Sequence, residues 1–135
     1  MAEQMALDYT QSVEQVIQAE NATKNTPDSV HARFVFWARN NGGAIRAMRA
    51  HALRVIKRQA MHGIDPYISV HYLFEWLRYD SPVLINGTDD FKIPNEYEPI
   101  FARYLAAHDP ALSAAIDLRA SRFDNIQFED LGWTA

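Results

Sequence analysis

The chain has 135 residues, of which 48% are hydrophobic and 22% are charged. This length and composition are typical of one globular domain and too apolar for a disordered protein. The chain contains no cysteine, which excludes disulfides, thiolate nucleophiles and cysteine-ligated zinc. It shows no signal-peptide pattern and no apolar run near the roughly 20 residues that a membrane span requires, so we expect a cytoplasmic protein without a membrane partner.

The net charge of -4 is unevenly distributed along the chain. Residues 1–28 hold five acids and one lysine, whereas residues 29–64 hold seven basic residues and no acid. From residue 65 onward, twelve acids accompany five basic residues. A basic block between two acidic ones predicts a basic surface patch on an acidic protein.

Residues 3–20 carry a modest apolar stripe at helical spacing, which predicts an amphipathic helix. Together with the polar break that follows, they form a predicted N-terminal arm and linker, residues 1–26. An isolated helix of this length is marginal in water. The arm is therefore expected to pack either on its own domain or on a second chain, and the latter arrangement would give a twofold homodimer.

The next predicted helix runs over about 28–39. Thr26 suits the N-cap position and Pro27 the first helical position. The run Asn40-Asn41-Gly42-Gly43 is expected to end this helix, because Asn and Gly accept the left-handed C-cap conformation. Three large apolar residues fall on one face of the helix: Val30, Phe34 and Trp37.

The helix predicted over 43–62 has the clearest pattern in the chain. Its apolar residues gather within an arc of roughly 100°: Ile45, Met48, Ala52, Val55 and Ile56. Five cations and no acid lie outside that stripe or at its border: Arg46, Arg49, Arg54, Lys57 and Arg58. These five are the candidate binding residues. Two interpretations stay open, a binding surface for an acidic partner and a surface that pairs with acidic segments of this protein itself.

Gly63 is expected to end that helix, and Asp65-Pro66 to start a helix over 66–80. This helix is apolar nearly all round, which predicts a central, buried position. Its apolar side is expected to comprise Ile68, Tyr72, Leu73, Trp76 and Leu77, with Val70 and Phe74 elsewhere on its surface. Glu75 is expected to be paired or exposed at an edge rather than to act as a general acid or base.

Two short apolar runs, 83–85 and 91–93, flank Asn86-Gly87, the strongest short-range signal for a β-hairpin. Asn95, with Glu98 three residues later, predicts a capping box at the start of the next helix, which ends near His108.

A last helix is predicted over 110–119, with Asp109 before it as the cap. The remaining residues, 123–135, form an acidic-aromatic C-terminal tail that is expected to pack on the body or on a partner.

The predicted fold is therefore mainly α, a compact helical domain of five to six helices over 27–122 with one short β-hairpin at 83–93. Helices followed by a hairpin give a winged-helix-like order of elements. The predicted core contains nine residues: Phe34, Trp37, Ile45, Met48, Ile56, Leu73, Leu77, Phe101 and Leu105.

Catalytic and metal-binding signatures are absent from the sequence. The five histidines form no HxxxH, HxH or HExxH pair, and no serine lies in a GxSxG context. Gly42-Gly43 does not form a phosphate loop, and Asp89-Asp90 is expected to be solvated. The prediction is a protein that is not an enzyme and has no metal or cofactor.

The stretch from Asp90 to Asn95 continues into a pattern with Tyr97, Pro99 and Ala102-Arg103, then His108 and Pro110, then Leu118-Arg119. This F-K-I-x-N-x-Y-x-P-x-x-A-R core with a following H-x-P resembles an uncharacterised family of small proteins of bacteriophages and prophages. The resemblance covers roughly residues 45–122. It implies phage origin and a compact, mainly helical domain, and it implies no activity. Pro94 and Asp109 depart from the family pattern.

Two functions follow as hypotheses. The leading one is a small phage-encoded DNA-binding or regulatory protein that uses the basic helix face. The alternative is a phage protein-interaction module that binds and modulates a host protein such as a defence nuclease, because a charged face and an acidic-aromatic tail also suit a protein partner. The sequence pI near 5.7 and the two acids at 89–90 in the predicted wing count against DNA.

Overall fold

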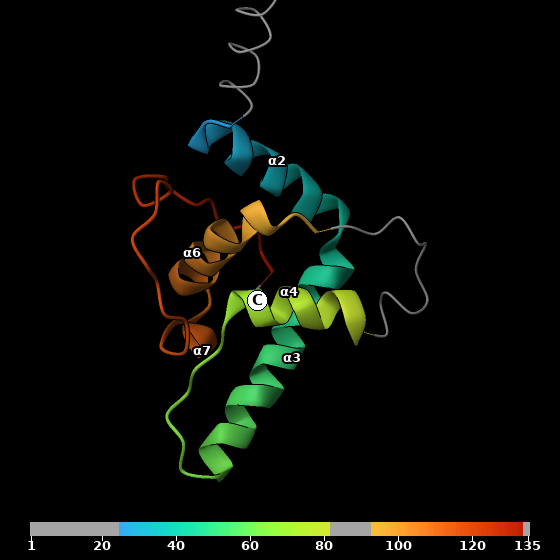
Figure 1. Cartoon of the computed structure of the whole chain (residues 1–135), viewed down its shortest axis with the longest axis vertical. Helices are drawn as coiled ribbons and strands as arrows, with labels where there is room; N and C mark the ends of the chain where they lie inside the picture. The colour runs from blue at the N-terminus through green and yellow to red at the C-terminus, as the bar shows by residue number, and fades with distance from the viewer. Residues whose placement is uncertain (1–24, 82–92, 134–135) are drawn as a thin grey trace, which may run out of the picture.

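The computed structural model describes residues 25–81 and 93–133 (Figure 1). In chain order its elements are α2 (Pro27–Asn40), α3 (Gly42–Met61), α4 (Val70–Tyr79), the 3-10 helix η1 (Asn95–Tyr97), α6 (Glu98–His108) and α7 (Pro110–Ser113). Within the described ranges, β structure is limited to one isolated parallel bridge between Ile68 and Ile116. The mainly helical class is confirmed. The predicted arm helix and all of the predicted hairpin except Ile93 lie outside the described residues, and Ile93 itself is in no strand.

Helix α2 begins as predicted and ends differently. The Thr26 hydroxyl accepts a hydrogen bond from the Ser29 amide at 3.3 Å, and Pro27 occupies the first turn. At the other end, Asn41 has a φ of -131° and neither Gly42 nor Gly43 has a positive φ, so the predicted left-handed cap is wrong. The side-chain amides of Asn40 and Asn41 instead donate to helix carbonyls at 2.8 Å. These bonds satisfy backbone carbonyls at the end of α2 without a left-handed residue, and α3 begins after a single intervening residue.

Helix α3 ends at a Schellman motif, which confirms the prediction for Gly63. Gly63 has a φ of 69°, its amide donates to the Ala60 carbonyl, and the Ile64 amide donates to the Gln59 carbonyl at 2.9 Å. The side chain of Gln59 then donates to and accepts from the backbone of Tyr67, each at 2.9 Å.

The following helix starts later than predicted. Its N-cap is Ser69, whose hydroxyl accepts from the Tyr72 amide at 3.3 Å, and not Asp65. The segment before it is held extended because Gln59 binds the backbone of Tyr67 and the Ile68 amide donates to the Ala115 carbonyl at 2.9 Å. Tertiary hydrogen bonds therefore override the helix-start signal of Pro66.

The buried face of α4 also differs from the prediction. Val70, Leu73, Phe74 and Leu77 are its buried residues, a stripe with the i, i+3, i+4, i+7 spacing of one helix face. Tyr72, which was expected on the apolar side, is 43% exposed. The helix packs on α3 and α6, and on its other side Tyr79 is exposed while Trp76 is partly buried.

The predicted capping box at the start of α6 is wrong. Residues 95–97 form η1, and α6 follows it without a side-chain cap. Asn95 accepts a hydrogen bond from Arg78 at 2.5 Å, and Glu98 pairs with His71 at 2.8 Å. Both side chains are thus engaged by α4, which lies beside α6 (Figure 1).

The last predicted helix is only one turn long. Asp109 caps α7 as predicted, accepting from the Ala111 amide at 3.2 Å, but α7 ends at Ser113 because Ile116 pairs with Ile68 in the bridge. The remaining chain runs along α6 (Figure 1).

The C-terminal segment packs on the body. The Leu131 amide donates to the Tyr104 hydroxyl at 2.9 Å. The centroid of the Trp133 ring lies 4.3 Å from that of the Tyr104 ring and 5.9 Å from that of the Phe34 ring. The tail therefore closes the core between α2 and α6. Seven of the nine predicted core residues are buried, and Trp37 and Ile56 are only partly so.

Candidate nucleic-acid interface

Four of the five predicted site residues form an exposed cationic surface on α3: Arg46, Arg54, Lys57 and Arg58. None of the four makes an ion pair with any acid in the described ranges. Helix α3 itself carries no acid. Among the described residues, these cations therefore form no ion pair with the protein's own acids, and most of the acidic N-terminal segment lies outside the described ranges.

Arg49 does not belong to this surface. Its Nε donates to Asp109 at 2.7 Å and its Nη2 lies 3.4 Å from the other carboxylate oxygen. The Asp109 side chain is fully buried. Arg49 therefore joins α3 to the start of α7 and is a structural residue.

The outer face of α4 continues the cationic surface with aromatic rings. Tyr72, Trp76 and Tyr79 lie within about 60° of one another around the helix, and Tyr79 is 74% exposed. From α3, His51 meets two of them: its ring stacks on Trp76 with centroids 4.1 Å apart, and its Nε2 lies 2.7 Å from the Tyr72 hydroxyl. These three aromatic residues, with His51, Arg54 and Arg58, are called the aromatic–basic face below.

Electrostatics links His51 to the cations of this face. Partial burial lowers the pKa of His51 below its ordinary value, and the nearby Arg54 and Arg58 lower it further. Asp80, an acid near His51, acts in the opposite direction. A neutral imidazole at neutral pH can hydrogen-bond Tyr72 and stack on Trp76 without adding charge.

The sequence interpretation missed this face because it placed Tyr72 and Trp76 on the same apolar side of the helix as Leu73 and Leu77. Helical periodicity already separated two apolar faces in the sequence. Residues 72, 76 and 79 lie on one face of the helix, and residues 70, 73, 74 and 77 lie on the other. Choosing which face is buried requires knowledge of the helices that pack on α4.

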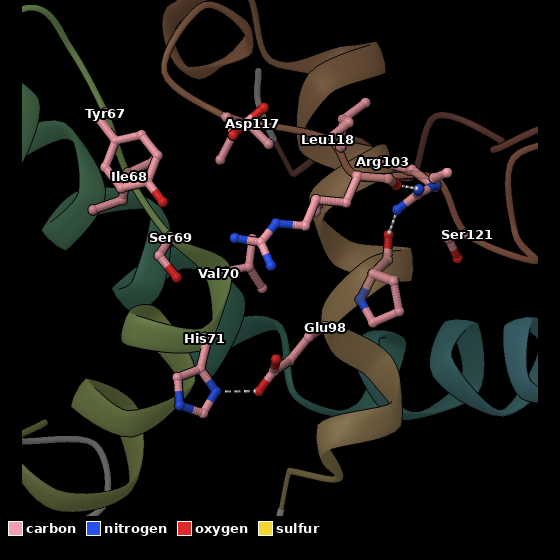
Figure 2. A pocket seen from close by; sticks show the side chains of 15 residues that line it. Tyr67, Ile68, Ser69, Val70, His71, Glu98, Arg103, Asp117, Leu118 and Ser121 are labelled. Atoms are coloured by element: carbon pink, nitrogen blue, oxygen red, sulfur yellow. Dashed lines mark hydrogen bonds and ion pairs between the residues drawn. The ribbon is translucent and has the colours of Figure 1, made fainter.

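A cleft of about 370 Å³ opens elsewhere, between the start of α4, the first half of α6 and residues 116–121 (Figure 2). At one end of it the His71 ring and the Glu98 carboxylate face each other at 2.8 Å. Hydrogen bonding to Glu98 raises the pKa of His71, which favours the imidazolium.

Arg103 forms part of the wall of this cleft and is buried. Its guanidinium donates to Asp124 at 2.6 and 2.8 Å, to the Pro99 carbonyl at 2.9 Å and to the Arg119 carbonyl. Through these bonds, Arg103 holds the C-terminal segment on α6. Within the described ranges, no three His, Asp or Glu side chains are arranged to hold a metal ion.

A third feature is an apolar groove of about 430 Å³ between α2 and Tyr97 of η1. Phe36, Trp37 and Tyr97 line it, and Phe36 is 73% exposed.

Comparison with known proteins supplies no assignment: no protein-family model, curated protein or solved structure matches this chain. Across the described ranges, no helix combines the length and the apolarity needed to cross a membrane.

Proposed function

We propose that this protein binds nucleic acid and acts as a small phage-encoded DNA-binding or regulatory protein. The observation that carries the proposal is the set of exposed cations on α3, which have no acidic partner among the described residues. Unpaired cations on one helix face attract a polyanion, and phosphate contacts supply most sequence-independent affinity.

The winged-helix-like order of elements is part of this proposal. In it, α4 takes the place of the recognition helix, and the hairpin that the sequence predicts at 83–93 takes that of the wing. The proposed site is reduced from five residues to four, because Arg49 is bound to Asp109.

The test is the affinity of the full chain for a labelled DNA duplex across a salt series. Affinity should fall steeply with salt, and Arg54→Ala, Lys57→Ala and Arg58→Ala should each weaken binding and reduce the salt slope by about 1. Arg119→Ala is the matched control, since it removes an exposed arginine outside α3. The proposal would be refuted if the chain bound no nucleic acid at low salt, or if Arg119→Ala lowered the affinity as much as the α3 variants did.

The alternative function, binding of a host protein, is supported by a different observation, the groove that Phe36 borders on α2. A pull-down from nuclease-treated host lysate separates the two functions. A stoichiometric protein that is retained by the native chain and lost with Phe36→Asp favours the alternative. Loss of all bound material after nuclease treatment favours nucleic acid.

A further inference from the structure

We propose that the aromatic–basic face binds single-stranded nucleic acid, with unpaired bases stacked on the exposed rings of Tyr72 and Tyr79 and phosphates held by Arg54 and Arg58. This inference rests on the proposed function and specifies its ligand class. It differs from the duplex recognition that a winged-helix-like order suggests.

The accessible rings are the first argument. Tyr79 is 74% exposed and Tyr72 is 43% exposed, although both lie on a helix whose opposite side is fully buried in the core. A soluble domain rarely groups exposed aromatic residues on one helix face without a partner. Tyrosine rings present an apolar face for stacking and a hydroxyl that stays hydrated.

The fixed geometry of the rings is the second argument. His51 holds the Tyr72 hydroxyl at 2.7 Å and covers Trp76 at 4.1 Å with an interplanar angle of 4°. The side chains at the centre of the face are thus ordered before any ligand arrives, so less conformational entropy is lost on binding.

Charge complementarity identifies the occupant. Arg54 lies 3.5 Å from His51, and Arg58 is close enough to lower the pKa of the same histidine. Neither arginine has an acidic partner among the described residues. Rings for stacking beside cations for phosphates are the two components of single-strand binding sites, and duplex DNA keeps its base faces covered.

The experiment compares a labelled single-stranded oligonucleotide with a hairpin duplex of the same sequence, measured by fluorescence anisotropy on the full chain at low salt. The single strand should bind more tightly. Tyr79→Ala should weaken single-strand binding about 5- to 140-fold, since stacking of one base is lost, and Tyr79→Phe should retain most of the affinity. Asp80→Asn should strengthen binding, because it removes a negative charge close to His51.

Phe36→Ala is the matched control, an aromatic residue with 73% exposure on α2. Equal loss in this control would overturn the inference, because the effect would then be general apolar contact. Duplex binding as tight as single-strand binding, with Tyr79→Ala unchanged, would also overturn it while leaving the proposed function intact. Failure of both ligands to bind would refute the proposed function itself.

Discussion

Arg49 and Asp109, sixty residues apart in the sequence, form a charged hydrogen-bond pair at 2.7 Å in which the aspartate is completely buried. The same carboxylate accepts the Ala111 amide at the start of α7. The pair therefore fixes the position of α7 on α3, and it separates Arg49 from the four cations of α3 that remain exposed, three arginines and Lys57.

This separation gives the first prediction. Arg49→Ala should lower the free energy of unfolding by about 3 kcal/mol, because it leaves a buried carboxylate without its charge partner. Arg46→Ala, an exposed arginine on the same helix, should change it by less than about 0.5 kcal/mol. Urea denaturation followed by circular dichroism measures both. Equal stability of the two variants would contradict the structural role of Arg49.

The second prediction concerns the two faces of α4. Leu77 is fully buried, so Leu77→Ala should cost about 2–5 kcal/mol of stability through lost burial and the cavity left behind. Tyr79→Ala, two residues away on the exposed face, should cost less than about 0.5 kcal/mol. Thermal and urea unfolding test this contrast, and a large loss for Tyr79→Ala would show that this ring is part of the core.

The third prediction is a pair of opposite histidine titrations. The hydrogen bond to Glu98 raises the pKa of His71 above 6.5, and Glu98→Gln should bring it back down. Partial burial lowers the pKa of His51 below 6.5, and Arg54→Ala should let it rise. Two-dimensional NMR across a pH series resolves both.

The same two shifts set opposite contributions to stability. The interaction of His71 stabilises the fold fully below pH 6.5 and is lost as the pH rises through the raised pKa. The contribution of His51 has the other sign, because its folded-state pKa is depressed: it is present above pH 6.5 and is lost as the pH falls through the lowered pKa. A wild-type His71 pKa at or below that of His51 would contradict this assignment.

The fourth prediction concerns Arg103, which binds three separate acceptor groups from its buried position. Arg103→Met should lower the melting temperature, since it leaves the Pro99 and Arg119 carbonyls without their donor. Arg103→Lys should recover only part of the loss, because an ammonium lacks the planar fork that reaches all three. Full recovery by lysine in a thermal-shift measurement would show that charge alone matters there.

The sequence by itself determined the features that depend on neighbouring residues. Thr26 and Pro27 predicted the start of α2, Gly63 predicted the end of α3, and Asp109 predicted the cap of α7. Each of these signals acts through hydrogen bonds or backbone angles within one helical turn, so no distant partner is needed. The apolar stripe of α3 belongs to the same group, because the periodicity of one helix defines it.

Tertiary structure determined the local structure at positions where a side chain can form hydrogen bonds either with its own helix or with another element. Asn95 and Glu98 match a capping box, yet Arg78 and His71 of α4 bind them instead. Asp65-Pro66 matches a helix start, yet the chain stays extended there because Gln59 binds the backbone of Tyr67.

The candidate site divides in the same way. The cations of α3 were evident from composition, whereas the pairing of Arg49 with Asp109 and the exposure of Tyr72 were not. Helix α4 has apolar residues on nearly every side, so its own sequence cannot select the buried face. The packing of α4 on α3 and α6 makes that selection and buries Leu73 and Leu77. It leaves Tyr72 next to His51, which lies 3.5 Å from Arg54.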